Sequence, residues 1–161
     1  MDGRDPFLAV VGNDEYRNGP WRIVILVEVE EVAGDALLRH ALAHSDIVVH
    51  RHAALALGAR GVADAVPTLI DMIVEGVSDT DVADALGVLA GDPALADQIA
   101  AKLVGRIASD AGDASARRRL TQALADIPGV TASRALEELS HDDDRAVAVT
   151  AAYLLKLRGA R

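Results

Sequence analysis

Four of the five histidines lie between His40 and His52, and histidine is the side chain that most often binds metal in proteins. His40 and His44 are four residues apart, so on one helix both rings would face the same metal ion. His50 and His52 are two residues apart and point to different sides of a helix, so at most one would join the pair. We therefore predict no metal site, and histidines that form ordinary hydrogen bonds at the surface or between helices.

Aspartates recur along the chain at intervals of 33, 34 and 31 residues, at Asp46, Asp79, Asp113 and Asp144. Each precedes a segment of helical pattern. There a carboxylate accepts hydrogen bonds from free backbone N–H groups and meets the positive end of the helix dipole. This capping role explains the spacing without any catalysis, and it also favours a helix cap over a cation site for the acidic run 142–144.

Positive charge is concentrated only at Arg117, Arg118 and Arg119. Successive helical residues diverge by about 100°, so these three side chains would not meet one line of phosphates. The formal charge of the chain is −9, which repels nucleic acid and anionic lipid. Nucleic-acid binding is therefore disfavoured.

Motifs for covalent chemistry are missing from the sequence. There is no cysteine, which removes disulfides, thiolate metal sites and a cysteine nucleophile. No serine lies in a nucleophile elbow, and no glycine-rich phosphate loop follows a strand. We predict no catalytic residue and no cofactor; missing motifs do not exclude an enzyme, although nothing favours one.

The composition indicates one helical domain with a core of small aliphatic side chains. Of 161 residues 51% are hydrophobic, yet the aromatic residues are only Phe7, Tyr16, Trp21 and Tyr153. Ala, Leu, Val and Ile must then form the core, which suits closely packed helices. The start of the chain lacks a secretory signal, and the apolar run Ile23–Val27 is far too short to cross a bilayer. We expect a cytoplasmic protein without membrane contact.

The N-terminal part of the chain is the hardest to assign. Residues 1–19 mix Gly, Asp, Asn and Pro without a period, which predicts an extended or partly helical arm. Residues 20–32 alternate β-branched side chains as a strand would, but Pro20 and Gly34 also bracket a helix. Because no partner strand is visible elsewhere, we predict a helix, followed by another over residues 35–43.

The clearest signal is a helical hairpin made of residues 46–59 and 62–75. Gly58 and Gly61 mark the turn between the two helices, and Pro67 lies in the first turns of the second helix, where a missing N–H costs least. The hairpin repeats along the chain with the four aspartates as its starts. Counting the helix over residues 20–32, the total is nine helices.

This repeat resembles the HEAT-like repeat of the phycobilin-lyase type, over roughly residues 34–159. The resemblance implies an all-α fold, a right-handed α-α superhelix with about four helical hairpins, formed by a domain over residues 20–161. First helices would line its convex side and second helices its concave side. The matching residues are Val49, Ala53, Ala54, Ala56, Leu57, Gly58, Gly61, Ala65, Val66, Pro67, Leu69 and Ile70.

The polar positions of the second helices would form one mixed-charge ridge along the concave side, which suits a polar protein or peptide better than a small apolar ligand. We therefore predict a non-enzymatic adaptor, scaffold or regulator that binds another protein. The alternative is an accessory lyase-type or cofactor-handling protein, which the resemblance allows. The ridge consists of Arg39, His40, Thr68, Asp71, Met72, Glu75, Lys102, Arg106, Arg134 and Glu138.

The final helix, over residues 144–158, begins a repeat that has no second helix. We expect its apolar residues to be only partly covered, so it either caps the domain or docks onto another copy of the chain or another protein, and we favour the cap. As a cap, its cations would complement its own C-terminal dipole. The apolar residues are Val147, Val149, Ala151, Leu154 and Leu155, and the cations are Lys156, Arg158 and Arg161.

Overall fold

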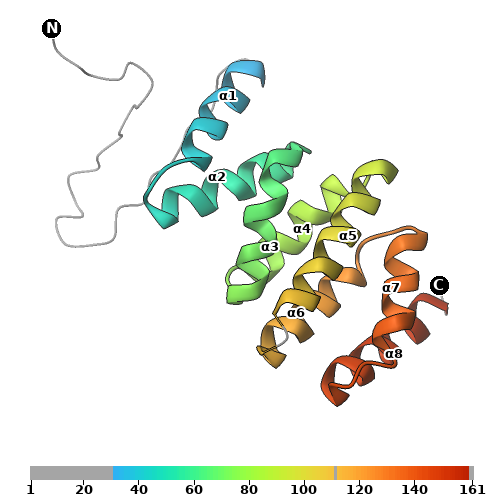
Figure 1. Ribbon diagram of the computed structural model, residues 1–161. Helices are drawn as coiled ribbons and strands as arrows, with labels where there is room; N and C mark the ends of the chain where they lie inside the picture. The colour runs from blue at the N-terminus through green and yellow to red at the C-terminus, as the bar shows by residue number, and fades with distance from the viewer. Residues whose placement is uncertain (1–30, 111, 160–161) are drawn as a thin grey trace, which may run out of the picture.

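The computed structural model describes residues 31–110 and 112–159, and side chains from residue 34 onward. The described chain is all-helical, as predicted, with eight α-helices and no strand (Figure 1). A 3₁₀ turn, Ala63–Ala65, leads into the third helix. The helices are α1 (Glu31–Leu42), α2 (Ile47–Ala59), α3 (Val66–Glu75), α4 (Asp79–Leu89), α5 (Pro93–Ser109), α6 (Ala114–Leu124), α7 (Val130–Leu139) and α8 (Arg145–Gly159).

The predicted hairpin is confirmed as α2 and α3, with Pro67 in the first turn of α3. Gly61 has a φ of +74°, a conformation that glycine adopts at little cost, so its place in the turn is confirmed. The predicted break at Gly34 is wrong, because α1 continues through this buried glycine. The predicted arm over residues 1–19 and residues 20–30 of the predicted helix over residues 20–32 lie outside the described residues.

Capping by aspartate is confirmed at three of the four predicted positions. The carboxylates of Asp46, Asp113 and Asp144 accept hydrogen bonds from backbone N–H groups in the first turns of α2, α6 and α8. The prediction for Asp79 is wrong: α4 begins after Ser78, which has a φ of +55° and no capping side-chain bond, and Asp79 is its first residue. An aspartate therefore caps a helix here where it is itself the residue directly before the helix, and Asp79 does not cap α4 because it already belongs to that helix.

The core consists of Ala, Leu, Val and Ile with one methionine, as the composition predicts. Small residues let the helices approach closely. A Cβ placed on Gly58 of α2 would lie 2.8 Å from the Cβ of Ala85 on α4 and 3.0 Å from Leu69 on α3. Gly58 therefore serves helix packing, in addition to the turn role predicted for it.

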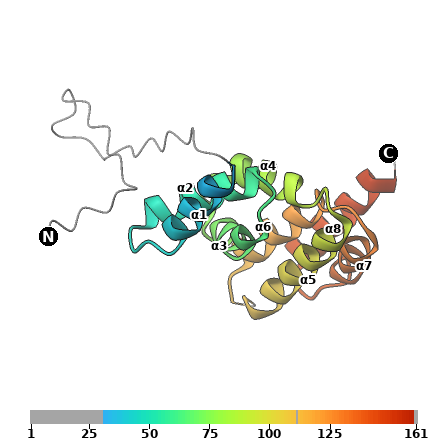
Figure 2. The ribbon, with the colours of Figure 1, turned by 90° about the horizontal axis from the view of Figure 1, so that it is seen from above.

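The helices follow one another from α1 at one end to α8 at the other, and the view from above shows the same elongated arrangement (Figure 2). Helix α4 packs on α2 and α3, whereas α5 packs on α6 and α7. The contact between α3 and α6 joins these two groups. The α4–α5 hairpin that the repeat predicts is thus not among the closely packed pairs of described helices.

Candidate functional site

Five residues of the predicted ridge come together around one shallow hollow, which we call the α3 groove. It has a volume of about 170 Å³ and is bounded by α2, α3 and the side chain of Arg106 from α5. The ridge residues in it are Thr68, Asp71, Met72, Glu75 and Arg106, and the remaining lining residues are Ile47, His50, Arg51 and Val74.

Two ion pairs border the α3 groove, and in both the carboxylate belongs to α3 and the arginine to another helix. On one side Arg51 of α2 donates to the Glu75 carboxylate at the end of α3. On the other, Arg106 Nη1 lies 2.8 Å from Asp71 Oδ1. Side chains of Asp71 and Glu75 are about half exposed, so both pairs face water. Such pairs typically contribute about 0–1 kcal/mol, and their charges can exchange partners at little cost.

The floor of the α3 groove is buried, which corrects the predicted ridge at two positions. Met72 is only 1% exposed and belongs to the core, and Thr68 is 8% exposed. The Thr68 hydroxyl lies 3.0 Å from His50 Nε2, while His50 Nδ1 bonds the Leu42 carbonyl oxygen. A carbonyl can only accept, so Nδ1 carries the proton, and in the neutral ring Nε2 accepts from Thr68. His50 thus links the end of α1 to α3.

Arg106 is held by two carboxylates. Its pKa is raised above the usual guanidinium value, first by the hydrogen bond to Asp110 and then by Asp71. Its Nε–H donates at 2.8 Å to Oδ2 of Asp110, the residue directly after α5. This second bond fixes the direction of the guanidinium, so Arg106 presents a permanent positive charge at the mouth of the groove.

The other predicted ridge residues do not reach the α3 groove. Arg39 on α1 forms an ion pair with Asp64 before α3. The rest are exposed on α1, α5 and α7: His40, Lys102, Arg134 and Glu138.

Sequence reasoning missed the contribution of α2 to the site, which includes Arg51 and the half-exposed Ile47. A signal for it was available. In an antiparallel hairpin the start of the first helix faces the end of the second, and Arg51 and Glu75 have opposite charges at those positions.

Hydrogen bonds are formed by three of the four clustered histidines, as predicted. Besides His50, the His44 ring accepts from the Asp46 N–H at 3.0 Å, and His52 Nδ1 lies 2.8 Å from the Val48 carbonyl oxygen. His44 also lies beyond the end of α1, so it does not continue the helical face of His40. The described residues include no group of three or more His, Cys, Asp or Glu side chains able to hold a metal ion.

Two members of the arginine cluster are engaged inside the fold. Arg117 pairs with Asp142 at 2.7 Å and is only 13% exposed. Arg119 of α6 donates to the carbonyl oxygens of Ile73, at 2.8 Å, and Val74 at the end of α3. Only Arg118 remains exposed, so this cluster presents little charge for phosphate.

Arg158 serves a different helix from the one predicted. Its guanidinium extends from α8 to the end of α6, where Nη2 donates to the carbonyl oxygens of Leu124 at 2.6 Å and Ala125 at 3.0 Å. The prediction that it complements the dipole of its own helix is therefore wrong, and Arg161 lies outside the described residues. Like Arg119, it joins one helix to the carboxyl end of an earlier one.

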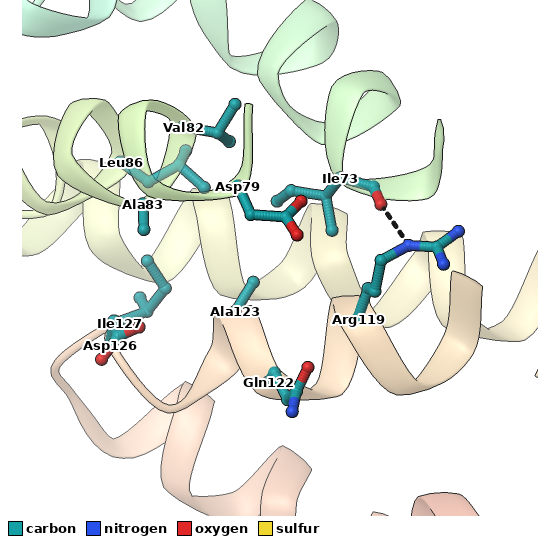
Figure 3. A pocket seen from close by; sticks show the side chains of 10 residues that line it. All are labelled: Ile73, Asp79, Val82, Ala83, Leu86, Arg119, Gln122, Ala123, Asp126 and Ile127. Carbon is teal, nitrogen blue, oxygen red and sulfur yellow. Dashed lines mark hydrogen bonds between the residues drawn. The ribbon is translucent and has the colours of Figure 1, made fainter. Parts of the chain in front are cut away.

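A second hollow, of about 150 Å³, separates α4 from α6 (Figure 3). Its apolar surface comes from both helices, from Ile73 and from Ile127, whereas Asp79, Gln122 and Asp126 add polar groups. Arg119 also borders it, but the guanidinium is turned toward the Ile73 carbonyl. Both hollows fall below the roughly 300–1,000 Å³ that sites for small molecules usually enclose.

Comparison of the chain with protein-family models, with curated proteins and with solved structures gives no match. Among the described helices, none is long and apolar enough to cross a membrane.

Proposed function

We propose that this protein is a non-enzymatic adaptor or regulator, folded as a short HEAT-like solenoid, that holds a polar segment of another protein in the α3 groove. The observation that carries the proposal is the pair of water-facing ion pairs, Arg51–Glu75 and Arg106–Asp71, on either side of a buried floor. Charges of both signs on neighbouring helices, with the acids on α3 and the arginines on α2 and α5, suit a partner of mixed charge.

Three features of the α3 groove support a protein segment over a small molecule. Its volume of about 170 Å³ holds little more than a side chain. Its ion pairs exchange partners at little cost, so an incoming peptide can replace one member of each pair. The exposed Ile47 beside the groove adds apolar contact area for an anchor residue.

Site-directed photo-crosslinking in the native cell tests this proposal. A photoreactive amino acid at Ile47 should capture a discrete partner, and the double variant Asp71→Lys/Glu75→Lys should abolish the capture. The matched control is Asp81→Lys/Asp84→Lys on the exposed face of α4, which changes the net charge equally. Capture that survives the groove variant, or that is lost equally in the control, would contradict the proposal.

A further inference from the structure

Helix α8 has one covered face and one open face. It packs on α6 and α7 through Val147 and Ala151, both fully buried. This corrects the expectation that these two residues are partly covered. On the open face Val149, Tyr153 and Leu157 are 61%, 60% and 43% exposed. They are spaced four residues apart, so they form one apolar stripe along the helix.

The same positions are polar in an equivalent helix. Counted from the capping aspartates Asp113 and Asp144, Val149 and Tyr153 correspond to Arg118 and Gln122 of α6, which are exposed. The fold therefore tolerates polar side chains at these positions, and the stripe is not required for the packing of α8. Contiguous exposed apolar residues with a tyrosine among them are typical of an interaction surface.

The charge along the stripe has the opposite sign to that of the whole chain. Arg145 precedes Val149 by four residues and Lys156 follows Tyr153 by three, so both exposed cations lie beside the stripe. Residues 145–159 include no Asp or Glu, whereas the formal charge of the chain is −9. Of the three acids directly before the helix, residues 142–144, only Asp143 is exposed.

We propose that the α8 stripe docks an amphipathic helix of another protein, with apolar residues on Val149, Tyr153 and Leu157 and acidic residues beside Arg145 and Lys156. Helices pack on one another through such stripes, and the cations select an acidic flank. A second copy paired through its own α8 would bring like charges together. An anionic membrane would be repelled by the formal charge of −9 of the chain. This surface is separate from the α3 groove and does not depend on the proposed function.

The test uses the full chain and two designed helical peptides. Both carry leucines along one face; one has glutamates beside the leucines and the other has lysines in their place. Fluorescence anisotropy at about 0.15 M salt, where surface charges still act over about 8 Å, measures the affinities. We expect the acidic peptide to bind at least tenfold more tightly than the basic one.

Variants distinguish the apolar and the charged parts of the surface. Tyr153→Ser with Val149→Ser should weaken the acidic peptide at least tenfold, while Val88→Ser on α4, another exposed valine, should leave it unchanged. Arg145→Glu with Lys156→Glu should reverse the preference between the peptides. The proposal is overturned if neither peptide binds, if the preference does not reverse, if sedimentation shows dimers that Tyr153→Ser dissolves, or if vesicles of phosphatidylglycerol bind the stripe more tightly than the acidic peptide.

Discussion

At the scale of single residues, Arg158 of α8 stabilises the carboxyl end of α6, where its guanidinium donates to backbone carbonyl oxygens. Replacing it by methionine keeps much of its aliphatic bulk but removes the charged donor from the part-buried carbonyls of Leu124, Ala125 and Ile127. Of these, Leu124 keeps a bond from the Ile127 N–H. We expect Arg158→Met to lower the free energy of unfolding by about 2–3 kcal/mol and the Tm by roughly 5–10 °C. Urea and thermal unfolding measure both. The control Lys156→Met, on the exposed side of α8, should change stability by no more than about 0.5 kcal/mol; equal losses would contradict the capping role.

Two glycines in helices provide opposite predictions. Gly58→Ala places a methyl group 2.8 Å from the Ala85 Cβ, which has no flexible end to move aside. The helices must separate, and we expect a loss of about 1–3 kcal/mol. Gly87→Ala on α4 meets nothing within 4 Å and should stabilise the helix by roughly 0.5–1 kcal/mol. Chemical denaturation measures the free energy of unfolding of both variants. A stabilised Gly58→Ala would show that α2 and α4 do not pack as closely as the 2.8 Å approach indicates.

At the scale of elements, local signals predict where helices begin better than they predict which helices meet. α2 and α8 begin directly after Asp46 and Asp144, because the capping bond is local. Gly34 carries the same local signal as a helix stop, yet its burial within α1 overrides it. The failure to predict the packing of α4 and α5 has the same origin, since a 3.6-residue period identifies an apolar face but not its partner.

The candidate site shows the same division between local and long-range information. The exposed polar edge of α3, with Asp71 and Glu75, follows from helical period alone. Met72 and Thr68 lie on that edge in sequence, but neighbouring helices cover them. The ion-pair partners of α3 lie 24 residues earlier at Arg51 and 35 residues later at Arg106, so only the tertiary packing brings them together.

Helices α3 and α6 join the two groups of helices, and Arg119 bonds across this contact. Arg119→Met should remove the side-chain donor from the Ile73 and Val74 carbonyls and loosen the last turn of α3. We expect backbone amides at the end of α3 to exchange hydrogen at least tenfold faster, as measured by mass spectrometry or NMR. Arg118→Met, its exposed neighbour, should leave exchange in α3 unchanged. Similar exchange in both variants would mean that apolar packing alone holds the contact.

At the scale of the whole molecule, we expect the net charge to affect the change of Tm with salt concentration more than the ion pairs do. Exposed pairs such as Arg51–Glu75 contribute about 0–1 kcal/mol each, whereas a formal charge of −9 repels itself throughout the fold. Salt near 0.1 M screens charges beyond about 10 Å. We therefore expect the Tm to rise by a few degrees between about 0.01 and 0.2 M NaCl.

The variant Asp81→Lys/Asp84→Lys isolates the cause of that rise. Each substitution adds two charge units, so the formal charge falls in magnitude from −9 to −5. Both side chains are exposed on α4, and neither forms an ion pair among the described residues. If self-repulsion is the cause, the same increase in salt should raise the Tm of this variant by a clearly smaller amount. A Tm that falls with salt, or an equal rise in both proteins, would instead place the response in the ion pairs or in general salt effects on apolar burial.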